Sequence, residues 1–355
     1  MEQIKVRPKV AVIGGGWYGC HIAKILDEAG CTVAGFEKTN SLLTGAAMSN
    51  QLRLHQGLHY LRSGVTRKQA LEGYTEFVET YPTLSSEVAR NIYAVPALES
   101  DLDASTVELI LSGSKIPFRS ISPSEYPWFQ GAEALYFCDE RLLNVAESRV
   151  YFEQSIGHLF KFNEELDYLK IQDFLSSGEF DYVIDATYFG IAEIAPEATH
   201  EITMLAEFES NSHWFEGGLT LVDGKLWSIY PTNVENTYSV SHVKHSILGH
   251  YRTQAESMSA VEQIIRTKSY EANLEAMREH VLKYVPRLRN DLDDMRIRFL
   301  TRKVKPLGNS ANREAFAAEV EPGLIFVQAG KIDAIFVVGR SILEIVEKWE
   351  PVQSG

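Results

Sequence analysis

Cysteine and long hydrophobic runs are both scarce in this chain of 355 residues. Its three cysteines, Cys20, Cys31 and Cys138, lack C-x-x-C and metal-ligand spacing, which favours reduced thiols over a disulfide framework. No run approaches the roughly 18 apolar residues of a membrane-spanning helix, and the first expected strand begins too early to leave room for a signal peptide. We therefore expect a cytoplasmic protein that does not insert into a membrane.

Positive charge is also in short supply. The chain has 34 Lys and Arg against 48 Asp and Glu, a net charge of −14 at pH 7, and no basic block. This balance argues against nucleic acid and anionic membrane surfaces as partners. The hydrophobic content of 45% is ordinary for a globular protein with a sizeable core. We expect a small-molecule substrate and a monomer or homodimer.

The N-terminal stretch carries a nucleotide-binding pattern. Hydrophobic periodicity predicts a strand, a helix and a second strand, at residues 10–13, 20–29 and 31–36. Gly14, Gly16 and Gly19 precede the helix in G-x-G-x-x-G spacing, and Glu37 ends the second strand. The glycines allow a tight turn and close approach of a pyrophosphate, while Glu37 can accept hydrogen bonds from a ribose. A glycine-rich turn that binds nothing is the alternative, but the ordered context favours an ADP-containing cofactor.

A dense polar segment follows this pattern directly. Residues 40–61 have the composition of a loop, and they contain Asn50, Gln51, Arg53, His55, Gln56, His59 and Tyr60. Loops beside a cofactor commonly carry function. We therefore expect this segment to contribute to the site, and a solvated loop is the alternative.

Later in the chain the pattern changes to short strands separated by turns. Strands are predicted at residues 91–98, 202–210, 219–222, 226–230, 237–243, 295–304 and 324–328, and helices at residues 255–284 and 334–349. Asp223-Gly224 is a strong hairpin signal, and Pro96 suggests that its strand lies at a sheet edge. The last strand and helix are expected to complete a parallel sheet begun at the N-terminus.

Four segments together resemble the FAD-dependent amine and amino-acid oxidoreductases, the family of D-amino-acid oxidase, glycine oxidase and sarcosine oxidase. They are GGGWYG with Glu37, NQLRLHQGLHYLRS, DYVIDATYFG and AGKIDAIF. The resemblance spans nearly the whole chain and is narrower to a bacterial biosynthetic-cluster branch of the family. It implies an α/β fold (α+β overall), with a Rossmann-like FAD-binding domain and an interleaved antiparallel-sheet substrate domain. The first would span residues 1–80, 140–200 and 320–355, and the second residues 81–139 and 201–319.

The resemblance also implies which residues hold FAD. Those expected to contact the cofactor are Gly14, Gly15, Gly16, Trp17, Tyr18, Glu37, Lys38, Gly45, Ala46, Asn50, Gln51, Arg53, Thr187, Gly190, Gly330, Lys331 and Ile332. The last three would line the N1–O2 edge of the flavin, where helix N–H groups or a lysine stabilise negative charge. Sarcosine oxidases tether FAD through a late cysteine, and no cysteine follows Cys138 here, so we expect non-covalent FAD.

Four residues are candidates for catalysis. Arg53 and Lys331 would act at the flavin edge, His55 would orient substrate or take a proton, and Tyr230 would bind a substrate carboxylate from the inserted sheet. The alternatives are an arginine that bonds phosphate or a loop carbonyl, a structural histidine and a core tyrosine. No metal site is expected.

These features predict an FAD-dependent oxidoreductase that removes hydride from the C–N bond of a small amine or amino acid. The alternative is an FAD-dependent oxidation, or a non-redox reaction, on a sugar-like or secondary-metabolite biosynthetic intermediate. A monooxygenase would need reduction by NAD(P)H, and the sequence has no second glycine motif for that coenzyme, although some such enzymes manage without one.

Overall fold

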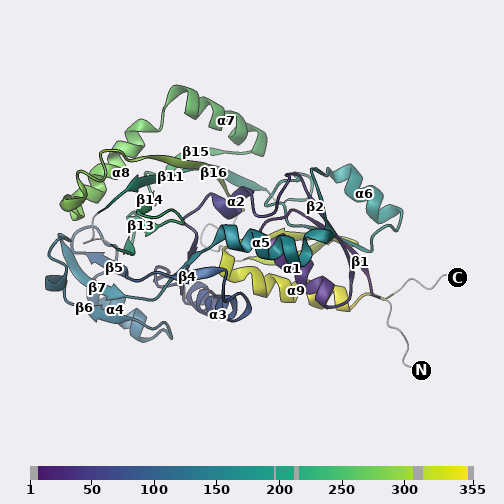
Figure 1. Cartoon of the computed structure of the whole chain (residues 1–355), viewed down its shortest axis with the longest axis horizontal. Helices are drawn as coiled ribbons and strands as arrows, with labels where there is room; N and C mark the ends of the chain where they lie inside the picture. The colour runs from purple at the N-terminus through teal and green to yellow at the C-terminus, as the bar shows by residue number, and fades with distance from the viewer. Residues whose placement is uncertain (1–6, 196, 212–215, 307–314, 351–355) are drawn as a thin grey trace. The chain divides into compact units, whose positions relative to one another are not determined.

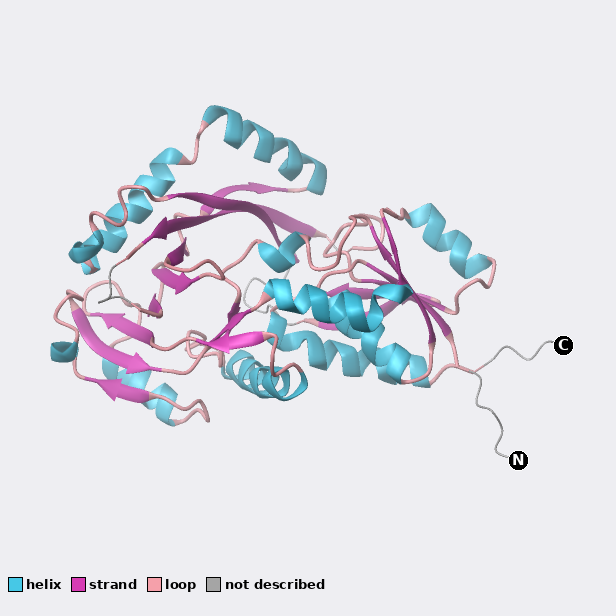
Figure 2. Cartoon of the chain, viewed as in Figure 1, coloured by secondary structure: helices cyan, strands magenta, loops and turns pink. Residues whose placement is uncertain are grey.

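The computed structural model describes residues 7–195, 197–211, 216–306 and 315–350. The chain forms two compact units, each built from separated segments. Unit 1 comprises Met1–Met48, Val145–Glu197 and Pro306–Gly355, and unit 2 comprises Ser49–Asn144 and Ala198–Lys305. Figure 1 follows the chain by colour, and Figure 2 distinguishes its helices from its strands. None of the described helices is long and apolar enough to cross a membrane.

A six-stranded sheet forms the centre of unit 1. Its strands, in spatial order, are β17 (Phe316–Glu321), β18 (Leu324–Gln328), β10 (Tyr182–Asp185), β1 (Lys9–Ile13), β2 (Thr32–Glu37) and β9 (Phe160–Phe162). The pairs in this sheet are parallel apart from that of β17 with β18. The prediction that the last strand completes the parallel sheet is confirmed, because β10 pairs with both β1 and β18.

The helices of unit 1 are α1 (Trp17–Glu28), α2 (Gly45–Met48), α5 (Val145–Ile156), α6 (Tyr168–Ser176) and α9 (Ile335–Glu347), with the 3-10 turns η2 (Gly157–Leu159) and η4 (Ile332–Ala334). α1 and α9 lie side by side (Figure 1). A Cβ added to Gly339 of α9 would lie 2.7 Å from the Ile25 side chain and 2.9 Å from the His21 ring of α1. The glycine therefore allows the close approach of the two helices.

A nine-stranded sheet dominates unit 2 (Figure 2). Its strands, in spatial order, are β15 (Ile247–Tyr251), β11 (Ala198–Glu209), β14 (Thr237–His242), β13 (Trp227–Pro231), β12 (Gly218–Leu221), β5 (Asn91–Pro96), β7 (Ala132–Phe137) and β6 (Arg119–Ile121), and β16 (Arg296–Pro306) pairs with β11. A separate sheet contains β3 (Arg53–Leu54), β8 (Arg141–Leu143) and β4 (Ser85–Glu87). The hairpin predicted at Asp223-Gly224 is confirmed, because β12 and β13 pair antiparallel. The edge predicted from Pro96 is wrong: β5 pairs with both β12 and β7, and Pro96 is its last residue, at a register shift.

The helices of unit 2 are α3 (Gly64–Thr80), α4 (Ala104–Ser112), α7 (Gln254–Thr267) and α8 (Glu271–Tyr284), with the 3-10 turns η1 (Pro123–Glu125) and η3 (Pro286–Leu288). The single helix predicted at residues 255–284 is therefore two helices. Lys268 takes a left-handed conformation with φ 52°, and this ends α7.

The two faces of the large sheet differ in chemistry. Leu219, Trp227 and Val240 belong to an apolar core that includes Met277 and Val281 of α8. Successive side chains of a strand point to opposite faces, so the intervening residues form a second face, which is mainly polar. In the central strands these are Thr220, Ser228, Tyr230, Ser239 and Ser241.

The division between the units falls earlier in the chain than the expected domain boundary. Residues 49–80 group with unit 2, whereas the sequence analysis assigned them to the FAD-binding domain. Two local contacts account for this grouping. β3 pairs with β8, and Leu58 and Leu61 pack in one apolar cluster with Tyr93 and Val95 of β5.

Candidate active site

The glycine turn of unit 1 has the conformation that close contact with a phosphate requires. Gly14 has a φ of +101°, and a Cβ there would lie 2.8 Å from the carbonyl oxygen of Ala186. A Cβ on Gly19 would lie 1.8 Å from the Gly14 carbonyl oxygen, so α1 packs directly on the turn. At Gly16 a Cβ would meet nothing within 4 Å. This open space beside the N-terminal N–H groups of α1 fits a pyrophosphate.

Glu37 ends β2, as the sequence predicts, and is 7% exposed. Its Oε2 accepts a hydrogen bond from the Gly15 N–H at 2.6 Å, and its Oε1 accepts from the backbone N–H and the hydroxyl of Thr39, both at 2.8 Å. A carboxylate has about four acceptor sites. The side chain therefore anchors the glycine turn and keeps capacity for a ribose hydroxyl.

Tyr18 joins two predicted cofactor segments that are 313 positions apart. Its hydroxyl donates to the Lys331 carbonyl oxygen at 2.7 Å and accepts from the Gly330 N–H at 3.0 Å. Burial raises the pKa of Tyr18, so the phenol stays neutral and can serve both roles. The structure therefore brings the start of α1 and the Gly330–Ile332 turn together within unit 1.

Asp333 lies in the same turn, and the sequence analysis did not select it. It is 5% exposed. Burial raises the pKa of Asp333 to about 6, against the opposing attraction of Lys331. The charge presented by this turn therefore changes close to neutral pH.

The remaining predicted cofactor residues of the N-terminal half lie in different settings. Trp17 is buried and packs edge-to-face on a phenylalanine of α5, with ring centroids 5.7 Å apart. Lys38 is exposed and lies 3.6 Å from a glutamate that precedes α6. Gly45 and Ala46 begin the short helix α2. In unit 2, the Asn50 side chain accepts a hydrogen bond from the backbone N–H two residues later, at 2.7 Å.

Thr187 and Gly190 lie in a turn that follows β10. The Oδ1 of Asp185 accepts from the backbone N–H of Thr187 at 2.9 Å and from its hydroxyl at 2.6 Å. The Gly190 N–H donates to the Thr187 hydroxyl at 2.9 Å. The turn lies against the glycine turn, because the Ala186 N–H donates to the Ile13 carbonyl oxygen at 2.9 Å.

In unit 2, Arg53 forms a buried ion pair with Glu140. Its Nε and Nη2 donate to Oε2 of Glu140 at 3.0 and 2.7 Å, and Tyr93 donates to the other carboxylate oxygen. The guanidinium also donates to the hydroxyls of Thr220 and Tyr93, each at 2.9 Å, and lies 4.5 Å above the ring of Tyr230. Burial opposes the charge of Arg53, but the attraction of Glu140 outweighs it and raises the pKa.

Gln51 lies on the polar face of the large sheet. Its Oε1 accepts from the hydroxyls of Ser228 and Ser241, at 2.7 and 3.0 Å. Its Nε2 donates to the Ser228 carbonyl oxygen at 3.3 Å and to the Ser239 hydroxyl at 3.5 Å. Tyr230 is fully buried on the same face, and its hydroxyl donates to a backbone carbonyl of β8 at 3.3 Å. The structure thus gathers Gln51, Arg53 and Tyr230 at one face of one sheet.

His55 is 5% exposed and lies beside this network. Its ring centroid is 4.4 Å from that of His59, and both rings lie beside Tyr60. The Nδ1 of His59 is 3.2 Å from the Tyr93 hydroxyl. His55 is therefore connected to the Arg53 network through His59.

A second hydrogen-bond chain joins β14 to α8. The Nδ1 of His242 accepts from the backbone N–H groups of Lys244 and His245, at 3.0 and 3.2 Å, so its Nε2 carries the proton. That nitrogen is 2.7 Å from Nδ1 of His280, and Nε2 of His280 is 2.8 Å from Glu99. The hydrogen-bond chain accordingly runs from His242 through His280 to the carboxylate of Glu99.

We expect the His242–His280–Glu99 hydrogen bonds to make the stability of the protein depend on pH. Burial, assisted by neighbouring His245 and His280, lowers the pKa of His242 from 6.5 to about 3. A lowered histidine pKa stabilises the fold above the unfolded-state value, and this contribution is lost as the pH falls from 6.5 towards 3. The free energy of unfolding should fall by about 1–2 kcal/mol between pH 7 and pH 5 through this residue. Urea unfolding of His242→Gln, whose amide does not titrate, should show a flatter pH dependence, and an unchanged slope contradicts the assignment.

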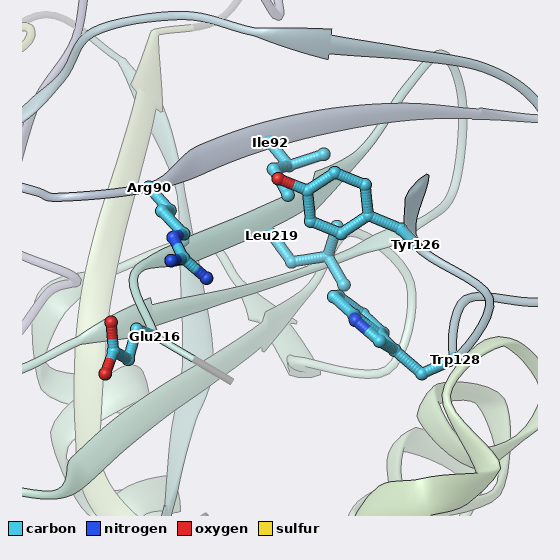
Figure 3. A pocket seen from close by; sticks show the side chains of 7 residues that line it. Arg90, Ile92, Tyr126, Trp128, Glu216 and Leu219 are labelled. Carbon is cyan, nitrogen blue, oxygen red and sulfur yellow. The ribbon is translucent and has the colours of Figure 1, made fainter. Parts of the chain in front are cut away.

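A small pocket lies on the apolar-core side of the large sheet (Figure 3). It contains about 250 Å³ of space, part of it open to solvent, and its lining is Arg90, Ile92, Tyr126, Trp128, Glu216, Gly218 and Leu219. None of the predicted site residues lines it. Among the described residues, no three His, Cys, Asp or Glu side chains are placed to hold a metal ion.

Three buried acids were missed by the sequence analysis. Asp185 and Asp333 lie within the DYVIDATYFG and AGKIDAIF segments, where an acid at a strand end or before a helix was a usable signal. Glu140 offered no such signal. Its role depends on pairing with Arg53, which is 87 positions away in the chain.

This chain is similar to known proteins in sequence and in fold. No protein-family model matches the chain. The chain is 35% identical over 344 residues to the FAD-dependent monooxygenase FPY4 of Fusarium mangiferae, which covers 95% of this chain and 91% of that protein. It is also 23% identical to the FAD-dependent monooxygenase kojA of Aspergillus flavus. This alignment of 382 residues covers 97% of this chain and 87% of that protein.

Among solved structures, glycine oxidase from Geobacillus kaustophilus superposes with a TM-score of 0.65 at 15% identity, over 98% of this chain and 96% of that one. L-α-glycerophosphate oxidase from Mycoplasma pneumoniae superposes with a TM-score of 0.69 at 13% identity, over 97% of this chain and 95% of that one. L-amino acid deaminase from Proteus myxofaciens gives 0.62 at 12% identity, over 99% and 92%. At these identities the likeness concerns the fold, and it extends over nearly the whole chain.

Proposed function

Because this chain belongs to the family of FAD-dependent oxidoreductases and monooxygenases, we propose that it oxidises the C–N bond of a small amine or amino acid. FAD is the cofactor, and when bound it supplies the acceptor for the hydride that leaves the substrate carbon. The substrate nitrogen gives up a proton, so the amine becomes an imine. The fold shared with glycine oxidase and L-amino acid deaminase supports this choice of bond.

The observation that carries the proposal is the contact of Tyr18 with the Gly330–Ile332 turn. It holds this turn against the first turn of α1, the helix whose N-cap residue is Gly16. In our proposal the glycine turn and Glu37 hold the ADP half of FAD without a covalent bond. Lys331 and the N–H groups of its turn then face the flavin, where positive charge stabilises the reduced form.

For the substrate we propose the polar face of the sheet in unit 2. Gln51 and the serine hydroxyls of this face offer both donors and acceptors. Arg53, Tyr230 and His55 are proposed to complete the face, the first two through the network around Glu140 and the third through His59. A face of this kind suits a small polar substrate that carries an amine and a carboxylate.

The similarity to named monooxygenases favours a second candidate function, FAD-dependent oxidation of a biosynthetic intermediate with NAD(P)H as reductant. The visible spectrum of the anaerobic protein separates the two. Under the first proposal, one member of a panel of amines and amino acids bleaches the flavin, and air restores the colour. Bleaching by NADPH alone, with no response to any amine, contradicts the first proposal and supports the second.

Lys331→Met should slow reduction of the flavin by substrate roughly 100-fold, because a group that stabilises developing negative charge is removed. FAD affinity should change far less, since the glycine turn is intact. Stopped-flow absorbance gives the reduction rate, and fluorescence of released flavin gives the affinity. Lys170→Met, at an exposed position of α6, makes the same change in net charge and serves as the control. Equal reduction rates in Lys331→Met and wild type would remove Lys331 from the flavin edge.

A further inference from the structure

Asp185 is a buried carboxyl group with an unmatched oxygen. It is 1% exposed, and its Oδ1 accepts both hydrogen bonds from Thr187. Its Oδ2 has no hydrogen-bond partner among the residues that the structure describes. Within the same residues, Thr187 is the only group in hydrogen-bond or electrostatic contact with the carboxyl. Nothing in the described part of the chain therefore balances a negative charge on Asp185.

A buried carboxylate without a cation is strongly disfavoured, so the group takes up a proton instead. Burial accordingly raises the pKa of Asp185, although the hydrogen bonds from Thr187 oppose the shift. With Oδ1 engaged as an acceptor, the proton belongs on Oδ2, which then becomes a donor. A buried donor with no acceptor is costly and requires an explanation, such as a bound molecule.

The position of Asp185 indicates which molecule this is. Asp185 is in register with Ile13, the last residue of β1, and Gly14 begins the glycine turn immediately afterwards. A Cβ on Gly14 would lie 2.8 Å from the carbonyl oxygen of Ala186, so the two turns are in direct contact. Ligands of parallel α/β sheets bind outside the carboxyl ends of the strands, and Asp185 lies at that edge.

We propose that Asp185 is a neutral carboxylic acid that donates a hydrogen bond from Oδ2 to an acceptor oxygen of bound FAD. It is a cofactor-binding residue in this proposal, and it also orders its own turn, because its Oδ1 accepts from the Thr187 hydroxyl that in turn accepts from the Gly190 N–H. The inference rests on FAD binding and holds whichever substrate is oxidised.

The donor is lost when Asp185 gives up its proton, and an anion then lies beside the dinucleotide. FAD affinity should therefore decrease as the pH rises through the raised pKa of Asp185. Asp333, whose pKa is about 6, also titrates in unit 1. The test is therefore the difference in the pH dependence of FAD affinity between wild type and an Asp185 variant, because Asp333 is present in both.

The experiment measures the FAD dissociation constant from flavin fluorescence on dilution of the holoprotein, between pH 5 and pH 9. Asp185→Asn keeps an acceptor for Thr187 and a donor at the second position. Its FAD affinity at pH 5 should therefore match that of wild type. At high pH it should not show the decrease in FAD affinity that deprotonation of Asp185 causes in wild type. Asp185→Leu keeps the size of the side chain but loses the donor, and should bind FAD about 10- to 100-fold more weakly at pH 5. Glu201→Gln, at a buried acidic residue of unit 2 that pairs with Lys305, controls for the loss of a buried acid outside unit 1 and should leave FAD binding unchanged.

Thermal unfolding of each apoprotein shows whether a weaker affinity reflects a damaged fold. If Asp185→Leu does not fold, the comparison of wild type with Asp185→Asn decides alone. Identical pH profiles for these two proteins overturn the proposal. So does a folded Asp185→Leu variant with wild-type affinity, a result that assigns Oδ2 to a buried water.

Discussion

Gly16→Val should fold normally and yet lose FAD. The backbone at Gly16 is extended, with φ −77° and ψ −177°, which suits a β-branched residue, and a Cβ there meets nothing within 4 Å of the protein. The same side chain occupies the space in which we place the pyrophosphate. Overpacking costs about 1–3 kcal/mol, which corresponds to FAD binding about 5- to 150-fold weaker.

The measurement pairs the flavin content of the purified protein with its thermal unfolding after FAD has been removed. Gly16→Ala should give an intermediate loss of flavin. Gly113→Ala, at the end of α4 in unit 2, makes a similar small addition where a Cβ has only ordinary contacts, and should keep full flavin content. A yellow Gly16→Val protein with wild-type affinity would show that the cofactor does not pass this residue.

Arg53→Met should be the most destabilising of the changes considered. The Glu140 side chain is 0% exposed, and the substitution leaves its charge buried without the cation that balances it. Loss of one partner of a buried ion pair costs about 3–5 kcal/mol in the free energy of unfolding. Urea unfolding should show this loss, whereas Arg289→Met, at an exposed arginine of unit 2, should change stability by no more than about 0.5 kcal/mol.

The double variant Arg53→Met with Glu140→Leu tests both the pair and the role proposed for Arg53. Removing both charges should restore at least half of the lost stability, since apolar replacements of buried ion pairs are often neutral. A double variant no more stable than Arg53→Met would show that the pair is not the source of the cost. If the stable double variant is reduced by substrate at the wild-type rate, Arg53 serves the architecture of the polar face and not the reaction.

The parts of the fold that local signals specify were predictable. The β1–α1–β2 unit and the position of Glu37 could be predicted from sequence alone. Their signals, an apolar run, three spaced glycines and a following acid, lie close together in the chain and form one known motif. The hairpin at Asp223-Gly224 is of the same kind, because a turn with restricted dihedrals sets the pairing of the strands around it.

Features that depend on distant partners or on unusual local chemistry were not predictable. β17 was missed because its FAAEVE sequence has little apolar alternation and pairs only along one edge. The break between α7 and α8 was missed because Lys268 takes the left-handed conformation without a glycine or proline to signal it. The contact of Tyr18 with Gly330 and the pairing of Arg53 with Glu140 exist only once the chain has folded.

The sheet of unit 1 takes its strands from both ends of the chain, and this has a consequence for biosynthesis. β1 and β2 leave the ribosome long before β18 and α9, which neighbour β10 and α1. Since non-local pairing must wait for its partners, the nucleotide fold stays incomplete until β18 has been made. In our proposal the turn at Gly330 holds FAD, so a nascent chain that stalls shortly before β18 lacks part of the cofactor site.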